Sequence, residues 1–126
     1  MKNVYFYLGL GTLFTHELDA IGNHEWRLFP ILQSLPEVFA MNTFILLHIP
    51  LFAVLVALIA STDDRLRKRS RLGVSIFLVV HAGLHLWFTS DVSYEFASTV
   101  SKLLIFGGAL FGGLHLVASY RDIRNF

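Results

Sequence analysis

Four long apolar stretches constrain the fold of this chain more than any other feature of its sequence. They cover residues of about 4–21, 38–60, 72–89 and 100–119, and each approaches the roughly 20 residues that a helix needs to cross a bilayer. Backbone amide and carbonyl groups find no water inside a membrane, so continuous apolar runs of this length are expected to be helical. We therefore predict an all-α integral membrane four-helix bundle made of one domain, residues 1–126.

The composition supports a membrane location and excludes several kinds of site. Hydrophobic residues make up 55% of the chain and its mean hydropathy is +0.61, which is more apolar surface than a soluble domain of this size buries. The chain contains no cysteine, which excludes disulfides, thiolate metal sites and cysteine nucleophiles. The first apolar stretch has no small-residue cleavage site after it, so we interpret it as a retained helix and not as a signal peptide.

The basic residues predict how the chain is oriented in the bilayer. With four spans, both termini and the middle loop share one side, which carries Lys2, Arg65, Arg67, Lys68, Arg69, Arg71, Arg121 and Arg124. The other side carries only Arg27 and Lys102. This bias places both termini in the cytoplasm. The basic loop is held between two spans, so we do not expect it to bind nucleic acid. The outer connection 23–37 is apolar enough to lie in the interface, with Trp26 and Arg27 near the lipid head groups.

The first span carries three ionisable residues within four positions: His16, Glu17 and Asp19. Such groups are costly in a membrane, so their presence needs a reason. On a helix, Asp19 lies about 60° from His16, and Glu17 lies about 100° away on the other side. One interpretation is a helix end whose charges face water or pair with Arg27. The other is a buried polar site centred on His16 in the outer half of the membrane.

The third span contributes a pair of histidines, His81 and His85, at the spacing i, i+4. This spacing projects both imidazoles from one face of a helix and is typical of two ligands to one metal. Given the predicted orientation, His85 lies near the depth of His16. Alternatively, the two side chains bind only backbone groups or water.

Two further histidines lie in the second and fourth spans. His48 precedes Pro50 by two residues, so it either repairs the hydrogen bonding of a proline kink or binds a metal or cofactor. His115 shares a helix face with Gly108 and Gly112, and small residues at this spacing allow close helix contact. That face could pack inside the bundle, or join a second copy of the chain or a larger membrane complex.

Together these residues predict a buried site of imidazole and carboxylate groups. We expect the metal ligands to be His16, Asp19, His81 and His85, with Glu17 as a further ligand or a catalytic base. Without thiolates, this donor set suits zinc, iron or manganese. If the protein is an enzyme, its apolar surroundings favour a hydrophobic substrate.

Two other functions fit the same residues. The first is a haem-binding electron carrier, with haem between histidines of facing helices. His48, His81, His85 and His115 could hold the haem, and His48 and His115 are its candidate cofactor ligands. The second is a non-enzymatic role, as a proton pathway in the bilayer or as a small accessory subunit of a membrane complex.

Residues 16–20, His-Glu-Leu-Asp-Ala, and 24–29, His-Glu-Trp-Arg-Leu-Phe, resemble a family of small bacterial membrane proteins of unknown function. More loosely, the chain is similar to the HXXEE-type membrane domains, although Ala20 stands at the second acidic position of that motif. The resemblance implies a shared four-helix architecture, a shared polar site and a location in the bacterial inner membrane. It implies no particular reaction.

Overall fold

The computed structural model describes residues 1–120, and the regular secondary structure of this part of the chain is entirely helical. The four α-helices are α1 (Lys2–Gly22), α2 (Glu37–Ile59), α3 (Asp64–Phe88) and α4 (Thr99–Ala118). Two 3-10 helices, η1 (Glu25–Leu28) and η2 (Leu32–Ser34), connect α1 to α2. The prediction of an all-α fold is confirmed for the described residues. Arg121 and Arg124, which entered the charge argument, lie outside them.

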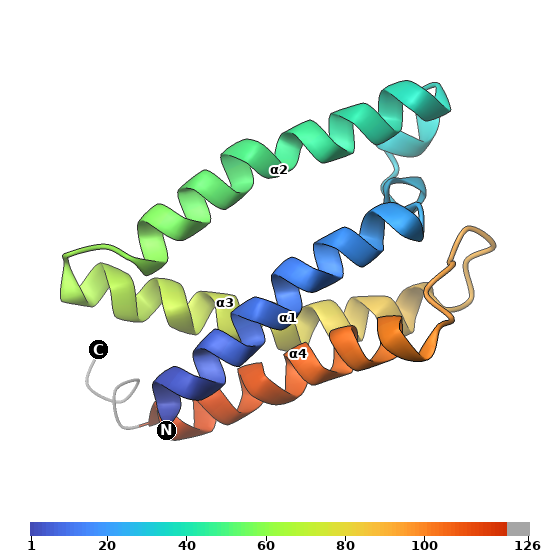
Figure 1. The fold of residues 1–126 in the computed structure, drawn as a ribbon. Helices are drawn as coiled ribbons and strands as arrows, with labels where there is room; N and C mark the ends of the chain where they lie inside the picture. The colour runs from blue at the N-terminus through green and yellow to red at the C-terminus, as the bar shows by residue number, and fades with distance from the viewer. Residues whose placement is uncertain (121–126) are drawn as a thin grey trace.

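Three of the four helices, α2, α3 and α4, are long and apolar enough to cross a membrane. The exception is α1, whose second half carries His16, Glu17 and Asp19. These polar residues lower the hydropathy of α1, yet the helix packs along α4 and crosses beside α3 (Figure 1). By composition alone α1 is therefore not among the candidate spans, although it packs against two helices that are.

Side-chain caps fix where α3 and α4 begin. The Asp63 carboxylate accepts a hydrogen bond of 2.9 Å from the Leu66 amide, and α3 therefore starts at Asp64, well before the apolar stretch that begins at Leu72. The Ser98 hydroxyl accepts a hydrogen bond of 2.9 Å from the Ser101 amide. Each such cap stabilises its helix by about 1 kcal/mol. As a result, the basic segment before residue 72 is the first part of α3, where the sequence alone suggested a loop.

The glycines of α4 let this helix approach α1 and α3 closely. A Cβ atom added at Gly112 would lie 2.7 Å from the backbone oxygen of Ser75, and one added at Gly108 would lie 3.2 Å from the Thr12 hydroxyl. Both glycines are buried, so their shared face is used within the chain. Assembly with a second copy or a larger complex stays a prediction, for which other surfaces are available.

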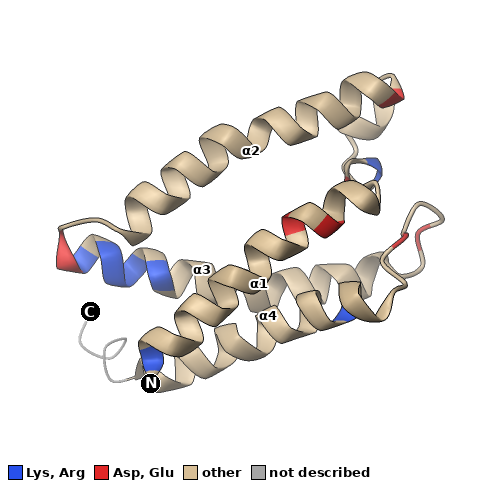
Figure 2. Ribbon diagram, viewed as in Figure 1, with Lys and Arg blue, Asp and Glu red and all other residues tan. Residues whose placement is uncertain are grey.

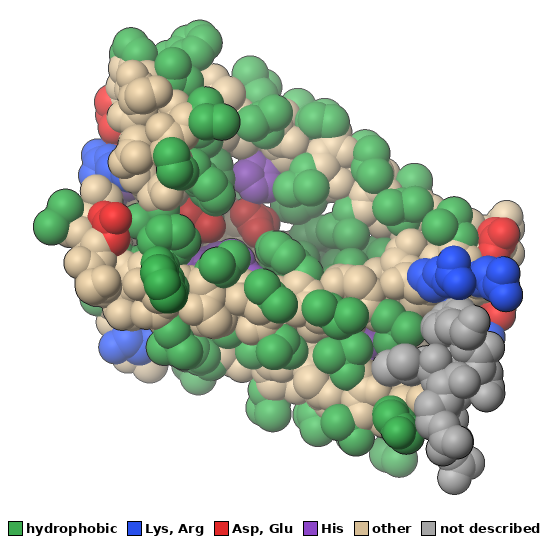
Figure 3. All heavy atoms as spheres, turned by 180° about the vertical axis from the view of Figure 1, so that it is seen from behind, with side chains coloured by type: hydrophobic (Ala, Val, Ile, Leu, Met, Phe, Trp, Pro, Cys, Tyr) green, Lys and Arg blue, Asp and Glu red, His purple; other side chains and the backbone are tan. Residues whose placement is uncertain are grey.

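Helix α2 stands apart from the other three (Figure 1). It packs against α3 and the two 3-10 helices, and only 11% of its most apolar segment is buried inside the protein, compared with 33% for α3. Seen from behind, the molecule is hollowed beside this helix, and histidine and acidic side chains are visible within the hollow (Figure 3). The polar site of the protein therefore lies beside the helix that is packed least.

Charged residues gather at opposite ends of the long helices. At one end, Lys2, Arg67, Lys68 and Arg71 line a common pocket. Figure 2 shows this basic end at the starts of α1 and α3, and acidic residues along the second half of α1 and at the other end, at the start of α2 and in the connection between α3 and α4. Asp63 and Asp64 are the acidic residues at the basic end, where Asp64 pairs with Arg67 and Lys68.

Candidate metal centre

Three histidines and one glutamate meet where the end of α1 approaches α3. The Nε2 atom of His81 lies 3.0 Å from Nε2 of His16 and 3.1 Å from Nε2 of His85. A carboxylate oxygen of Glu25 lies 3.6 Å from Nε2 of His16. The four side chains each offer a ligand atom, and these atoms all lie within 4.8 Å of one another. The structure therefore contains a buried histidine and glutamate cluster that could bind a metal.

The spacing of these atoms fits a bound metal as well as it fits hydrogen bonds. Bonds of 2.0–2.1 Å in a tetrahedral site place neighbouring ligand atoms about 3.3 Å apart, close to the separations within the cluster. A neutral imidazole has one donor and one acceptor nitrogen. The Nε2 atom of His81 has two other Nε2 atoms within hydrogen-bond distance, and one proton on it can serve only one of them. A cation at the centre would use the lone pairs of all three imidazoles.

Glu25 reaches the cluster because the chain reverses direction immediately after α1. His24 has φ 51° and ψ 42°, in the left-handed region that non-glycine residues rarely adopt. The next side chain, Glu25, is thereby buried at 7% exposure, and its Oε2 atom has no hydrogen-bond partner. Burial, and to a smaller extent the nearby carboxylates of Glu17 and Asp19, raise the pKa of Glu25 to about 8. A buried carboxylate without a partner is costly, and a bound cation would remove that cost.

Sequence reasoning missed Glu25, because it lies beyond the end of the helix that carries His16. Helical geometry relates positions within α1 and says nothing of a residue that follows a left-handed turn. The signal that was available is the position of Glu25 directly after His24, within the segment 24–29 that carries the family resemblance.

The connection between α3 and α4 closes the cluster from one side. Nδ1 of His85 lies 3.2 Å from the Tyr94 hydroxyl. If Nε2 held a metal, Nδ1 would carry the proton and donate to this oxygen, which would fix the orientation of the ring. Phe96 is 1% exposed and packs against the rings of both His16 and His85. Burial and the charge of Glu25 raise the pKa of Tyr94, so its hydroxyl keeps its proton.

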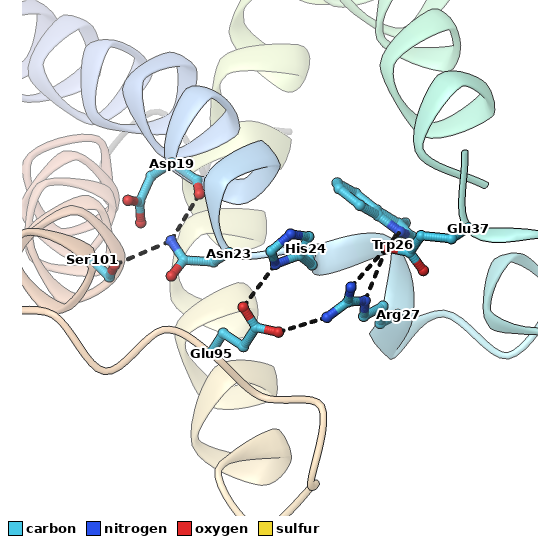
Figure 4. A network of polar contacts seen from close by, with 8 residues as sticks. All are labelled: Asp19, Asn23, His24, Trp26, Arg27, Glu37, Glu95 and Ser101. Carbon is cyan, nitrogen blue, oxygen red and sulfur yellow. Dashed lines mark hydrogen bonds and ion pairs between the residues drawn. The ribbon is translucent and has the colours of Figure 1, made fainter. Parts of the chain in front are cut away.

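An ion-pair network holds η1 against the start of α2 and the connection between α3 and α4 (Figure 4). Nδ1 of His24 lies 2.7 Å from one oxygen of Glu95, and Arg27 donates to the other oxygen at 2.8 Å. Arg27 also donates to Glu37 at 2.8 Å, and the Trp26 indole donates to the same carboxylate at 3.2 Å. Trp26 is 1% exposed, so its ring packs inside the protein, and its depth near the lipid head groups stays a prediction. This network positions the two residues that flank Glu25.

Asp19, one of the predicted metal ligands, is not one of the four clustered residues. Its Oδ2 atom is buried and has no hydrogen-bond partner, and the same is true of Nδ1 of His16, one helical turn earlier. The side chain of Asn23 donates to the backbone oxygen of Asp19 at 2.8 Å and reaches the Ser101 hydroxyl at 3.5 Å (Figure 4). Asp19 thus lies beside the cluster, where its charge acts on Glu25 and His85.

Glu17 and His48 form a separate pair across α1 and α2. Their Oε2 and Nε2 atoms lie 2.8 Å apart, and Nδ1 of His48 lies 2.7 Å from the backbone oxygen of Phe44. A carbonyl oxygen only accepts, so Nδ1 must donate, and the contact with Glu17 then requires one more proton on either partner. His48 does not bind the carbonyl of Leu46, which Pro50 leaves without its usual helical donor, so it does not repair the kink in the way the sequence suggested.

His115 lies elsewhere in the bundle, away from the cluster. Its Nδ1 atom is 2.7 Å from the Ser75 hydroxyl, and its ring packs against Phe6 with 5.3 Å between the centroids. Ser75 precedes His85 by ten residues of α3, which separates the two sites by about 15 Å along the helix. The structure therefore does not bring His48 and His115, two of the four histidines considered for haem, to one site.

A cavity of about 350 Å³ lies between α2, α3, the end of α1 and the two 3-10 helices. Three members of the cluster line it, namely Glu25, His81 and His85, together with the Glu17–His48 pair. The remaining nine lining residues are Leu or Phe. The volume is within the range of small-molecule sites. The cavity therefore combines an apolar wall with two groups of polar side chains.

Comparison with known proteins gives a family and no activity. Neither a curated protein nor a solved structure matches the chain. A family described as a family of unknown function, DUF6713, matches residues 2–122, which is nearly the whole chain. The resemblance to an uncharacterised family is thereby confirmed in this general form. On this match, the chain belongs to the DUF6713 family.

Proposed function

We propose that this protein binds one divalent transition metal in a membrane through His16, Glu25, His81 and His85. The observation that carries the proposal is the convergence of three Nε2 atoms on a buried carboxylate oxygen that has no hydrogen-bond partner. Three imidazoles and one carboxylate, without a thiolate, suit zinc, iron or manganese. Asp19 is proposed to support the ligands electrostatically from beside them.

The proposed location is a bacterial inner membrane with both termini in the cytoplasm. Three helices of suitable length and hydropathy support a membrane location, and the basic end of the molecule supports the orientation. In this arrangement α1 also crosses the bilayer, as the first of four spans. Its polar second half faces the interior of the bundle. The metal site then lies in the outer half of the membrane.

The reaction that fits this site best is metal-assisted chemistry on a hydrophobic substrate. A bound metal ion would supply Lewis-acid polarisation of a substrate oxygen. Glu17 lines the same cavity and is held by His48 at 2.8 Å, so we assign it the role of the base that accepts a proton. The apolar wall of the cavity would exclude water and hold the rest of the substrate.

Elemental analysis of purified protein in detergent tests the metal site directly. We expect about one zinc, iron or manganese per chain in the wild type, and loss of that metal in a His16→Ala/His85→Ala double variant. His115→Ala is the matched control, because it removes a buried histidine outside the cluster and should leave the metal in place. A wild-type protein that takes up none of the three metals after reconstitution would overturn the proposal.

A visible spectrum of the same samples distinguishes the haem hypothesis. A Soret band that disappears in His48→Ala or His115→Ala would favour haem over the metal site proposed here. The absence of both metal and colour after reconstitution would favour a proton-relay or accessory role for the buried histidines.

A further inference from the structure

The cavity beside α2 has an almost wholly apolar surface, although five of its fourteen lining residues are histidine or glutamate. These five come from α1, η1, α2 and α3, and the apolar residues include Leu47 and Leu51 from α2 and Leu84 and Phe88 from α3. Glu17 and His48 satisfy each other, whereas Oε2 of Glu25 has no hydrogen-bond partner although this residue is only 7% exposed. An occupant of this cavity must therefore be largely apolar, and a single polar end would have its partners on the side of Glu25.

Three of the four candidate metal ligands line this cavity, so a metal held by them would be accessible from it. Glu25, His81 and His85 line it, and His16 does not. Iron and manganese take more ligands than these four side chains supply, and zinc can accept a fifth. A ligand in the cavity would therefore reach the metal from the same side as the apolar wall, with an oxygen atom as the fitting donor.

The cavity is open toward the part of the surface that a bilayer would cover. Leu47 and Leu84, which line it, are 55% and 47% exposed, and the hollow between α2 and the other helices is visible from outside (Figure 3). A volume of about 350 Å³ is near the lower limit for ligand sites, so there is room for one hydrocarbon chain and not for two chains side by side. Access from the bilayer and this volume both favour a slender amphiphile.

We propose that the cavity binds one single-chain amphiphile from the bilayer, a fatty acid or fatty acyl compound with a carboxyl or carbonyl head. Its hydrocarbon chain lies along Leu47, Leu51 and Leu84, and its head oxygen reaches the side of the cluster formed by Glu25, His81 and His85. Binding of the head rests on the proposed metal site, whereas binding of the chain rests on the cavity alone.

Quenching of Trp26 fluorescence by a brominated fatty acid tests this proposal. Trp26 is buried, and its ring lies 6.0 Å from that of Phe44, which lines the cavity. The other tryptophan, Trp87, is 79% exposed and would be quenched by lipid, so the experiment uses a Trp87→Phe background in nanodiscs of unbrominated lipid. We expect saturable quenching, and no comparable quenching when the bromines are placed on a diacyl phospholipid of the bilayer.

The decisive comparison is between two double variants. Leu47→Phe/Leu84→Phe fills the cavity and should weaken binding about tenfold or more, since it displaces chain methylenes. Leu46→Phe/Leu86→Phe places the same substitutions on the same helices at exposed positions that do not line the cavity, and should leave binding unchanged. Absence of saturable quenching, or equal effects of the two variants, would overturn the proposal.

Metal content, measured on the same samples, separates this proposal from the proposed function. Failure of quenching in a protein that holds its metal would sink the amphiphile and leave the metal site intact. In metal-loaded protein, the brominated acid should bind about tenfold more tightly than a brominated alkane of equal length. Equal affinity for acid and alkane would overturn the assignment of the head to the metal, even if the chain binds.

Discussion

Nε2 of His16 lies 3.0 Å from Nε2 of His81, although 65 residues of sequence separate them. This contact joins the polar half of α1 to the centre of α3 and brings Glu25 and His85 into the same small volume. The proposed metal site therefore depends on this contact between α1 and α3.

Glu25→Gln should weaken zinc binding by more than about 100-fold, because an amide in place of the carboxylate removes the anionic ligand. Asp91→Asn is the matched control, since Asp91 is an exposed carboxylate of the α3–α4 connection that accepts a hydrogen bond from the Ser93 amide. Competition titration against a chromophoric chelator in detergent measures both. Equal zinc affinity in the wild type and Glu25→Gln would remove Glu25 from the ligand set.

Asp19→Asn should lower the affinity for zinc by roughly 10–100-fold while leaving about one zinc per chain at saturation. The expected loss is partial because Asp19 lies beside the ligands and acts on them through its charge. The stoichiometry and affinity of Asp19→Asn and His16→Ala are compared in one titration series. Complete loss of the zinc in both variants would instead make Asp19 a direct ligand.

Metal-free wild-type protein should lose stability relative to Glu25→Gln as the pH rises from about 5 to about 8. The pKa of Glu25 is about 8 in the folded protein and near 4.5 in the unfolded chain, so the folded state holds a proton that the unfolded state has lost. The contribution of Glu25 to stability is therefore full below about pH 4.5 and falls as pH rises through this window. Thermal unfolding of both proteins in detergent at several pH values measures the difference between their midpoints. A difference that stays constant, or that changes in favour of the wild type as the pH rises, would contradict the assignment.

Zinc binding should tighten as the pH rises toward about 8. The ion displaces the proton that Glu25 otherwise carries, so acid competes with the metal. Below that pH the contribution of Glu25 is about tenfold in affinity for each pH unit. Zinc titrations of wild type and Glu25→Gln at matched pH isolate this contribution as the difference between their slopes. Parallel slopes would show that Glu25 releases no proton on binding.

Gly112→Ala should destabilise the protein by about 1–3 kcal/mol, because the new Cβ would lie 2.7 Å from the Ser75 backbone oxygen. Gly113→Ala, one position along, meets nothing within 4 Å and should leave stability unchanged or slightly raised. Unfolding midpoints of the two variants give the comparison. Similar midpoints would mean that α4 does not approach α3 as closely as the structure places it.

The helical fold and three members of the cluster could be predicted from the sequence because they depend on local spacing. His81 and His85 share a face at i, i+4 wherever α3 lies, and the cost of polar groups in an apolar helix singles out His16. Which carboxylate completes the cluster depends on the left-handed turn at His24, which no periodicity reveals. Asp19 and Glu25 are equally acidic, and only the path of the chain after α1 distinguishes them.

The loose packing of α2 was also beyond prediction from sequence. Its apolar stretch is the cleanest of the four, and a run that is hydrophobic on all sides does not indicate which side meets protein and which meets lipid. For the same reason the cavity between α2 and α3 could not be anticipated. His48 was singled out correctly as a polar group of α2, but its partner Glu17 is set by where that helix lies.

All four side chains of the cluster come from α1, η1 and α3, and none comes from α2. A metal would therefore fasten the beginning of the chain to its third helix and leave the second free of that bond. Helix α2 also has the smallest buried share of the three candidate spans, so it is the span with the least packing against the rest of the protein. An outward tilt of α2 would separate His48 from Glu17 and widen the cavity, yet it would leave all four side chains of the cluster in place.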